Sequence, residues 1–288
     1  MLKSELIERV WNEFLYPAGA NRPTFDILDG NITAAAVTLR LEGIQEFVPQ
    51  GIIEIDSELI LTKDEEASVD VDVAQRGYGA TTAATHDDGA RVYFNPEFPR
   101  QTISDAIDNC ILQLPGMGLY ARDTVAATFP TNTGALYALP AGAMEVLAIV
   151  DDDTGHQLNS GREFSEIRAF TPPKIRFIGG ASGAITIVYT KDFVAPASET
   201  TDLTTTSLVP TSLVPFIPLW VAGYLLQGRE LTMLQVESVR QRLAVEGINP
   251  GSITSIARAL MDLFEQKYVG REAVKQTKKD PPRWRFVP

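Results

Sequence analysis

The chain has 288 residues, 44% of them hydrophobic and 22% charged, and a formal net charge of −12 at pH 7. This length predicts about two domains with ample buried core, and the composition excludes a fibrous or disordered protein. A strongly acidic chain is not expected to bind nucleic acid over a broad face, because phosphate neutralisation requires clustered Lys and Arg.

The scarcity of Cys and His limits the chemistry further. The single cysteine, Cys110, excludes an intrachain disulfide and lies on the apolar face of a predicted helix, where we expect a small buried hydrophobe. The only histidines are His86 and His156, so no zinc site of His and Cys is expected within one chain. The most apolar window, 213–226, is too short to cross a bilayer, and we expect a soluble protein without a cofactor.

Five segments carry apolar residues at helical spacing. They are Lys3–Leu15, a segment from Pro99 to Pro115, and then Phe216–Gln227, Leu231–Glu246 and Ser252–Tyr268. Each has one apolar stripe that it cannot bury alone, so the economical solution is one bundle of about five helices. The alternative is a separate helical domain near the C-terminus, with the early helices packed on the β modules.

Between the helices the apolar period changes to two, which indicates short strands. The first β module is predicted from strands near residues 37–41, 53–55, 59–61, 69–73 and 92–94, as a small antiparallel barrel or sandwich. The second is predicted from strands at 144–150, 164–169, 174–178 and 184–189. The glycine-rich run 179–183 predicts a hairpin turn between the last two strands.

The predicted fold class is therefore α+β: a bundle of about five helices carrying two inserted small antiparallel β modules, with an extended C-terminal tail. The predicted division is 1–28 for the first bundle helix, 29–98 for the first β module, 99–125 for the second helix, 126–196 for the second β module, 197–212 for a linker, 213–269 for the C-terminal bundle helices and 270–288 for the docking tail.

Candidate catalytic groups are few. His86 lies beside two aspartates in a loop of small residues, where a hydrogen bond to the backbone is favoured over a role as general base. Glu54 and Glu58 could form the carboxylate pair of a cell-wall hydrolase, but both fall in a predicted edge or turn without an apolar pocket to raise a pKa. The acidic run 151–155 lacks the ligand spacing of a calcium loop and favours a polar hairpin turn.

The densest run of structural signals extends from Gln75 to Ile107. An Arg-Gly strand end is followed by a loop of small residues containing one histidine, and then by an amphipathic segment. This order resembles head-to-tail connector proteins of tailed bacteriophages, and the preceding stretch 51–59 also fits their pattern. The matching positions are Arg76, Gly77, Gly79, Thr81, Ala84, His86, Gly89 and Val92, with Ala80 intervening where Gly and Thr are usually contiguous.

The resemblance implies a structural virion protein and no enzyme. It implies a head-to-tail adaptor, assembled in the host cytoplasm, that forms a ring of twelve copies beneath the portal protein and contacts a downstream neck or tail protein. Double-stranded DNA would pass through its channel without sequence-specific binding, and no membrane would be involved. A stopper, a tail terminator or a fibre-attachment protein remains an open alternative.

The final stretch is basic, and its residues 275–288 have no helical stripe. From Lys267 onward it has seven basic and two acidic residues, and Pro281 and Pro282 favour an extended conformation. Aromatic and basic residues alternate after the prolines, which suits a strand laid in a partner's groove, whereas the alternative is a disordered terminus. The portal is the partner that the resemblance implies, and the predicted docking residues are Arg271, Lys275, Lys278, Lys279, Arg283, Trp284, Arg285 and Phe286.

Overall fold

A computed structural model describes residues 1–17, 23–43, 51–63, 69–128, 136–158, 160–170, 173–178, 183–227 and 253–277. The chain forms two compact units, each assembled from segments far apart in the sequence. One unit joins Ser4–Ile107 to Pro218–Met261, and the other joins Met1–Lys3 and Asp108–Ile217 to Asp262–Pro288. Each unit combines β structure with helical segments.

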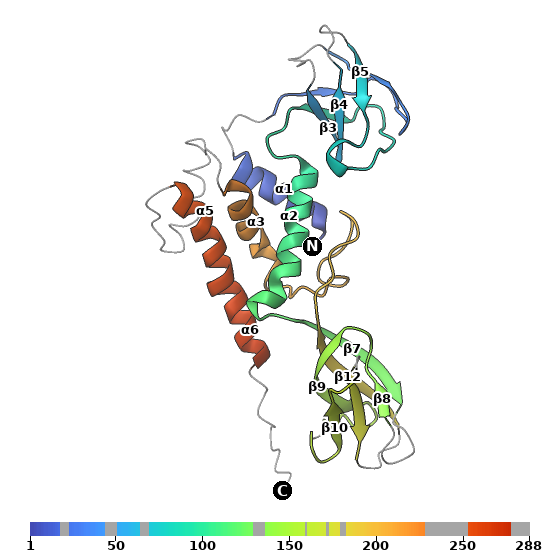
Figure 1. Ribbon diagram of the computed structural model, residues 1–288, viewed down its shortest axis with the longest axis vertical. Coiled ribbons are helices and arrows are strands. Elements are labelled where there is room, and N and C mark those ends of the chain that lie inside the picture. The colour runs from blue at the N-terminus through green and yellow to red at the C-terminus, as the bar shows by residue number, and fades with distance from the viewer. Residues whose placement is uncertain are drawn as a thin grey trace. The chain divides into compact units, whose positions relative to one another are not determined.

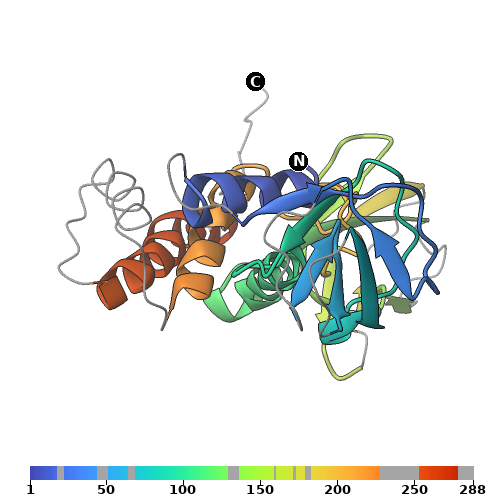
Figure 2. The same ribbon diagram turned by 90° about the horizontal axis from the view of Figure 1, so that it is seen from above.

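A six-stranded antiparallel sheet dominates the first of these units (Figures 1 and 2). Its strands, in the order β1-β6-β3-β4-β5-β2, are β1 (Phe25–Ile27), β6 (Arg91–Phe94), β3 (Ile52–Ile55), β4 (Glu58–Thr62), β5 (Asp70–Gln75) and β2 (Thr38–Arg40). The two outer strands meet just beyond their ends, where Asp29 N donates to Arg40 O and Glu42 N donates to Ile27 O. The sheet therefore curls into a small barrel, which pairs edges that would otherwise be open.

Alternate side chains of these strands fill the barrel interior. The interior cluster consists of Leu28, Leu39, Leu41, Ile53, Ile55, Ile60, Val71, Val73, Val92 and Phe94. The period-two pattern predicted β2 to β6 but not β1, which lies in the range expected for the first helix. In β4 it is Ile60 that joins the cluster, while Leu59 and Leu61 do not. A shift of one residue exchanges the two faces of a strand, so which face is interior depends on pairing with β3 and β5.

Two three-stranded antiparallel sheets form the β structure of the other unit. One contains β7 (Ala121–Thr128), β12 (Ala184–Lys191) and β9 (Ala143–Asp151), and the other contains β10 (Phe164–Ile167), β11 (Lys174–Phe177) and β8 (Leu136–Ala138). Residues of both sheets share one buried cluster. The predicted hairpin between β11 and β12 is wrong, because these strands belong to different sheets. Ile175 and Ile187 both enter the shared core, which requires the chain to change layers between them.

The helices of the barrel unit are α1 (Lys3–Val10), continued by a π-helical turn at Trp11–Leu15, most of α2 (Arg100–Gln113), α3 (Ile217–Leu226) and α5 (Ile253–Asp262). Trp11 is 6% exposed and lies against Tyr93 of β6, with 5.7 Å between ring centroids, so it belongs to the core of this unit. Gly223 marks a close approach of α3 to α5, since a Cβ there would lie 2.6 Å from Ala257 O.

The helical part of the other unit contains the end of α2, a 3-10 turn at Leu114–Met117, a π-helical segment at Leu263–Val269 and α6 (Gly270–Thr277). Lys3 is buried in an ion pair with Asp108, with 2.7 Å between Nζ and Oδ1. Cys110 is fully buried, as predicted, and burial raises the pKa of its thiol well above the usual value.

The predicted fold class is wrong. Over the described residues the chain is mostly β, with twelve strands in three antiparallel sheets, and its helices are divided between two units instead of forming one bundle of about five. An apolar helical stripe specifies that one face is buried but not what covers it. Here Trp11 of the first helical segment packs against a barrel strand.

The predicted helix at 231–246 and the part of the predicted docking tail from residue 278 onward lie outside the described residues. Among the helices that are described, none is both long enough and apolar enough to span a bilayer.

Candidate functional site

One buried carboxylate organises the loop that follows β5. Glu58 begins β4, is 1% exposed, and receives the guanidinium of Arg76 in a two-point contact: Nε donates to Oε1 and Nη2 to Oε2, both at 2.7 Å. The backbone N–H groups of Gly77 and Ala84 each donate to the same carboxylate at 2.9 Å. Two-point arginine contacts of this kind are strong and geometrically specific, so both ends of the segment 77–84 are attached to one side chain.

The ring of His86 completes the cluster by lying between two carboxylates. Its Nε2 is 2.9 Å from Oε2 of Glu58 and its Nδ1 is 2.8 Å from Oδ2 of Asp56. Burial acts to lower the pKa of His86, but the hydrogen bonds to Asp56 and Glu58 outweigh it, and the net pKa is raised. With an acceptor at each ring nitrogen, the arrangement favours the doubly protonated imidazolium.

The pKa values of the two carboxylates are both lowered. Burial acts to raise the pKa of Glu58, but the contacts with Arg76, the Ala84 N–H, His86 and the Gly77 N–H together lower it to about 2. The pKa of Asp56 is lowered chiefly by the hydrogen bond from His86. The cluster therefore contains two cations and two anions that stabilise one another.

Further hydrogen bonds attach this cluster to a distant part of the chain. Arg76 Nη1 donates to Thr33 O and Nη2 donates to Ala84 O, each at 2.6 Å. The backbone of His86 exchanges two hydrogen bonds with Ile32, each at 3.0 Å. The loop is thus held against the segment that precedes β2 as well as against β4.

Backbone conformation explains why the loop begins with glycine. Gly77 has φ +59, and a Cβ at this position would lie 2.8 Å from Thr81 O and 3.1 Å from Ala83 N. Thr81 closes the turn, since its Oγ1 donates to Tyr78 O and accepts from Leu59 N. Ala80, where the sequence departs from the connector pattern, adopts φ +67, a conformation that costs more for alanine than for glycine.

The structure brings together four of the eight positions that carry the resemblance. Arg76 and His86 contact Glu58 through their side chains, and Gly77 and Ala84 contact it through their backbone N–H groups. Thr81 binds the backbone of β4 instead, while Gly79 (φ +62) and Gly89 (φ +83) occupy turns. The expected hydrogen bond from the His86 ring to the backbone is not what forms, because both ring nitrogens face carboxylates.

Sequence reasoning missed Glu58 as the centre of the cluster and Asp56 as its outer member. Both lie in the stretch 51–59, which resembles the connector pattern, and Glu58 directly precedes the apolar residues of β4. A carboxylate at the first position of a buried strand requires a cation as its partner, and this requirement could have linked Glu58 to Arg76.

The carboxylates considered for a hydrolase have structural partners. Glu54 is fully buried, and its Oε1 accepts the backbone N–H of Arg100 at the start of α2, where the helix dipole favours an anion. Glu58 has a pKa of about 2 and five hydrogen-bond donors, which leaves it unsuited to donate a proton. Glu58 therefore lacks the raised pKa that a glycosidase acid requires.

Two smaller expectations concern metal binding. In the part of the chain that the structure describes, no group of three or more His, Cys, Asp or Glu residues is placed to hold a metal ion. The acidic run after β9 forms the predicted polar hairpin: Asp151 Oδ1 accepts from the N–H groups of Asp153 and Thr154, and Asp151 N donates to His156 O.

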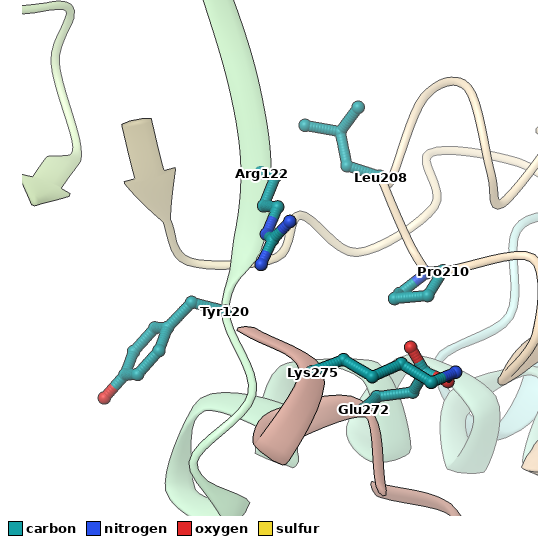
Figure 3. A pocket seen from close by; sticks show the side chains of 6 residues that line it. All are labelled: Tyr120, Arg122, Leu208, Pro210, Glu272 and Lys275. Atoms are coloured by element: carbon teal, nitrogen blue, oxygen red, sulfur yellow. The ribbon is translucent and has the colours of Figure 1, made fainter. Parts of the chain in front are cut away.

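An open pocket of about 320 Å³ lies beside the start of the predicted docking tail (Figure 3). It is lined by Tyr120, Arg122, Leu208, Pro210, Glu272 and Lys275. The prediction of an extended tail is wrong for residues 270–277, which form α6. Of the predicted docking residues, Arg271 and Lys275 lie on this helix, where Lys275 pairs with Glu272, and the other six lie outside the described residues. The pocket lining mixes both charges with apolar surface and has no recognisable cofactor pattern.

The solved structures that the chain is similar to include three chains of gene transfer agent particles. The chain is similar to a chain from the neck of an empty gene transfer agent (GTA) particle solved with C6 symmetry, at 16% identity and a TM-score of 0.22, covering 56% of this chain and 77% of that one. A chain of the native GTA virion is 15% identical with a TM-score of 0.23, and the likeness covers 56% of this chain and 77% of that one. A chain of the native GTA neck solved with C12 symmetry is 14% identical with a TM-score of 0.20, and the likeness covers 55% of this chain and 80% of that one. TM-scores this low do not establish a common fold. No family model matches the chain, and neither does any curated protein sequence.

Proposed function

We propose that this chain is a structural protein of a tailed-phage-like particle, and that it acts as a head-to-tail adaptor in a ring beneath the portal. The observation that carries the proposal is the cluster around Glu58. Three positions that carry the connector resemblance, Arg76, Gly77 and His86, converge on this carboxylate, as does the backbone of a fourth, Ala84. The resemblance therefore resides in residues that determine the loop's architecture.

The chemistry of the described residues supports a structural role. Each carboxylate of the Glu58 cluster is paired, and Glu54 binds the N-terminus of α2. A net charge of −12 suits a ring through which DNA must move, because an acidic surface does not retain phosphates.

In this proposal the residues after α6 bind the portal. Helix α6 ends at Thr277, so residues 278–288 begin directly after a helix that belongs to a compact unit. Trp284 and Phe286 are the apolar anchors, and the neighbouring arginines supply hydrogen-bond donors, a combination enriched at interface hot spots.

The experiment is a mass measurement of the purified chain alone and mixed with purified portal. A portal-bound assembly with twelve copies of this chain supports the adaptor assignment. Binding to a tail component, with no affinity for portal, would instead assign the chain to a stopper, a tail terminator or a fibre-attachment protein. Imaging of the assembled particle then shows which ring the chain occupies.

A further inference from the structure

One face of the β8–β11–β10 sheet points away from the core of its own unit. In the β11 register, Ile175 and Phe177 enter the buried cluster, so Lys174 and Arg176 point to the opposite face. Their cross-strand neighbours on that face are uncharged: Leu136 and Ser165 flank Arg176, while Ala138 and Ile167 flank Lys174. The two cations therefore have no carboxylate at the adjacent cross-strand positions.

Large apolar side chains surround these cations. Leu136 is 47% exposed, Phe170 42% and Ile178 45%. Lys174 Nζ lies over the Phe170 ring, 4.2 Å from its centroid, and makes a cation–π contact with it. An exposed surface that combines apolar side chains with one sign of charge is typical of a protein interface. This surface, made of Leu136, Phe170, Lys174, Arg176 and Ile178, is called the basic sheet face below.

The positive charge of the basic sheet face indicates an acidic partner surface. The chain as a whole carries −12, so two copies repel each other except where a basic surface meets an acidic one. The loop held by Glu58 presents such an acidic surface: Asp87 and Asp88 are exposed, and the exposed residues before them, Ala80, Thr82, Ala84 and Thr85, are small.

The same loop has little conformational freedom to lose on binding. Arg76, Gly77 and Ala84 are attached to Glu58, and Asp88 is oriented by its contacts with Gly30 N and the Asn31 side chain. A preorganised loop with small side chains pays a low entropic cost at an interface. It also leaves room for the large apolar side chains of the basic sheet face.

We propose that the basic sheet face binds loop 79–88 of a second copy of this chain, with Asp87 and Asp88 facing Lys174 and Arg176. Because the two surfaces differ, the contact is head-to-tail, and repeated contacts of this type generate a ring when the rotation closes. The inference rests on the proposed ring and adds the surfaces that form it. It is tested on the chain alone, so that its failure is separate from a failure to bind portal.

The first test exchanges the charges. Asp87→Lys and Arg176→Glu are made singly and together, and self-association is measured by sedimentation over a concentration series at low salt. Each single variant places like charges opposite each other and should weaken association roughly tenfold or more. The double variant restores opposite charges and should recover most of the loss. Single variants that associate like the parent, or a double variant as weak as the singles, would overturn the proposal.

The second test reports the contact directly. Cys110 is fully buried, so an introduced surface cysteine can be crosslinked selectively. Chains carrying Asp87→Cys are mixed with chains carrying Arg176→Cys and oxidised, which should yield a disulfide-linked dimer of the two variants. Asp152→Cys, at another exposed position, is the matched control and should not crosslink to the Arg176→Cys chain. No crosslink at the highest soluble concentration overturns the proposal.

The basic segment 278–288 is the rival occupant of the acidic loop. A chain that lacks this segment should associate as the full chain does. If its removal abolishes association while Arg176→Glu has no effect, the segment binds the loop and the basic sheet face does not. The folded state of every variant is checked by circular dichroism and thermal unfolding, and the double variant separates a charge effect from misfolding.

Discussion

The imidazole of His86 lies with its Nε2 2.9 Å from Oε2 of Glu58, although the two residues are 28 positions apart. This contact joins the end of the small-residue loop to the first residue of β4. Together with Arg76 and the exposed Asp56, these residues form a group of alternating charges that only the closed barrel can assemble.

Replacing Glu58 by Gln should destabilise the barrel unit by about 3 kcal/mol or more, because removing one member of a buried ion pair leaves the other charges uncompensated. Chemical denaturation of the purified variant measures the change. Glu42→Gln is the matched control: the side chain of Glu42 is exposed, and its backbone hydrogen bond remains, so the expected change is within about 0.5 kcal/mol. Equal stability of the two variants would contradict the structural role of Glu58.

Stability should pass through a maximum with pH. The pKa of Glu58 is lowered from 4.5 to about 2, so its stabilising contribution is present above pH 4.5 and is lost as the pH falls toward 2. The pKa of His86 is raised from 6.5, so its contribution is complete below pH 6.5 and is lost as the pH rises through the folded-state value. We therefore expect the free energy of unfolding to be highest between about pH 4.5 and 6.5, where both contributions are fully present.

The matched variants for this pH profile are His86→Gln and His156→Gln. The first should remove the alkaline decline that the parent shows above pH 6.5, whereas the second should retain it, because His156 lies in an exposed hairpin. Denaturation midpoints measured from pH 3 to pH 9 would show the difference. An alkaline decline that survives in the His86→Gln chain would refute the charged imidazolium.

Gly77→Ala should destabilise the loop by about 1–3 kcal/mol, since the new Cβ would require φ +59 and would lie 2.8 Å from Thr81 O. Gly89→Ala is the comparison in the same loop: it has φ +83, but no atom lies within 4 Å of the added Cβ. Gly89→Ala should therefore lower the free energy of unfolding by about 1 kcal/mol, which is the cost of a positive φ for alanine without any steric clash. Thermal unfolding distinguishes the two, and a larger loss at Gly89 would argue against the close contact at Gly77.

Gly223→Ala tests the packing of α3 on α5. The added methyl group would lie 2.6 Å from Ala257 O and 2.8 Å from Met261 Cγ, so we expect overpacking to cost about 1–3 kcal/mol. Gly116→Ala, which meets no atom within 4 Å and has no positive φ, should be neutral or slightly stabilising. Urea denaturation of both variants gives the comparison.

Deletion of residues 278–288 should leave the melting temperature unchanged and abolish binding to portal. The cut follows Thr277, so α6 and its Glu272–Lys275 ion pair are retained. Trp284→Ala combined with Phe286→Ala should lose most of the affinity without shortening the chain, because aromatic anchors carry much of an interface's binding energy. A truncated chain that binds portal with undiminished affinity would disprove the docking role.

Local patterns determined much of the secondary structure. The spacing of apolar residues predicted the helical segment Lys3–Leu15 and helix α2, and alternation predicted strands β3 to β6, because each signal depends on neighbours within a few positions. Likewise, Arg76, Gly77 and His86 were recognised as a unit from their order in the sequence, without knowledge of what they contact.

Tertiary structure alone decided which buried faces meet. The sequence shows that Ile175 and Ile187 are apolar, but only the two-layer packing places their strands in different sheets. It shows a helical stripe containing Trp11, but only the folded unit places that side chain against Tyr93 of the barrel. Hydrophobic burial is non-directional, so local spacing does not show which apolar faces pack together. Ion pairs such as Glu58 with His86 join residues far apart in the sequence, so local spacing does not show these pairs either.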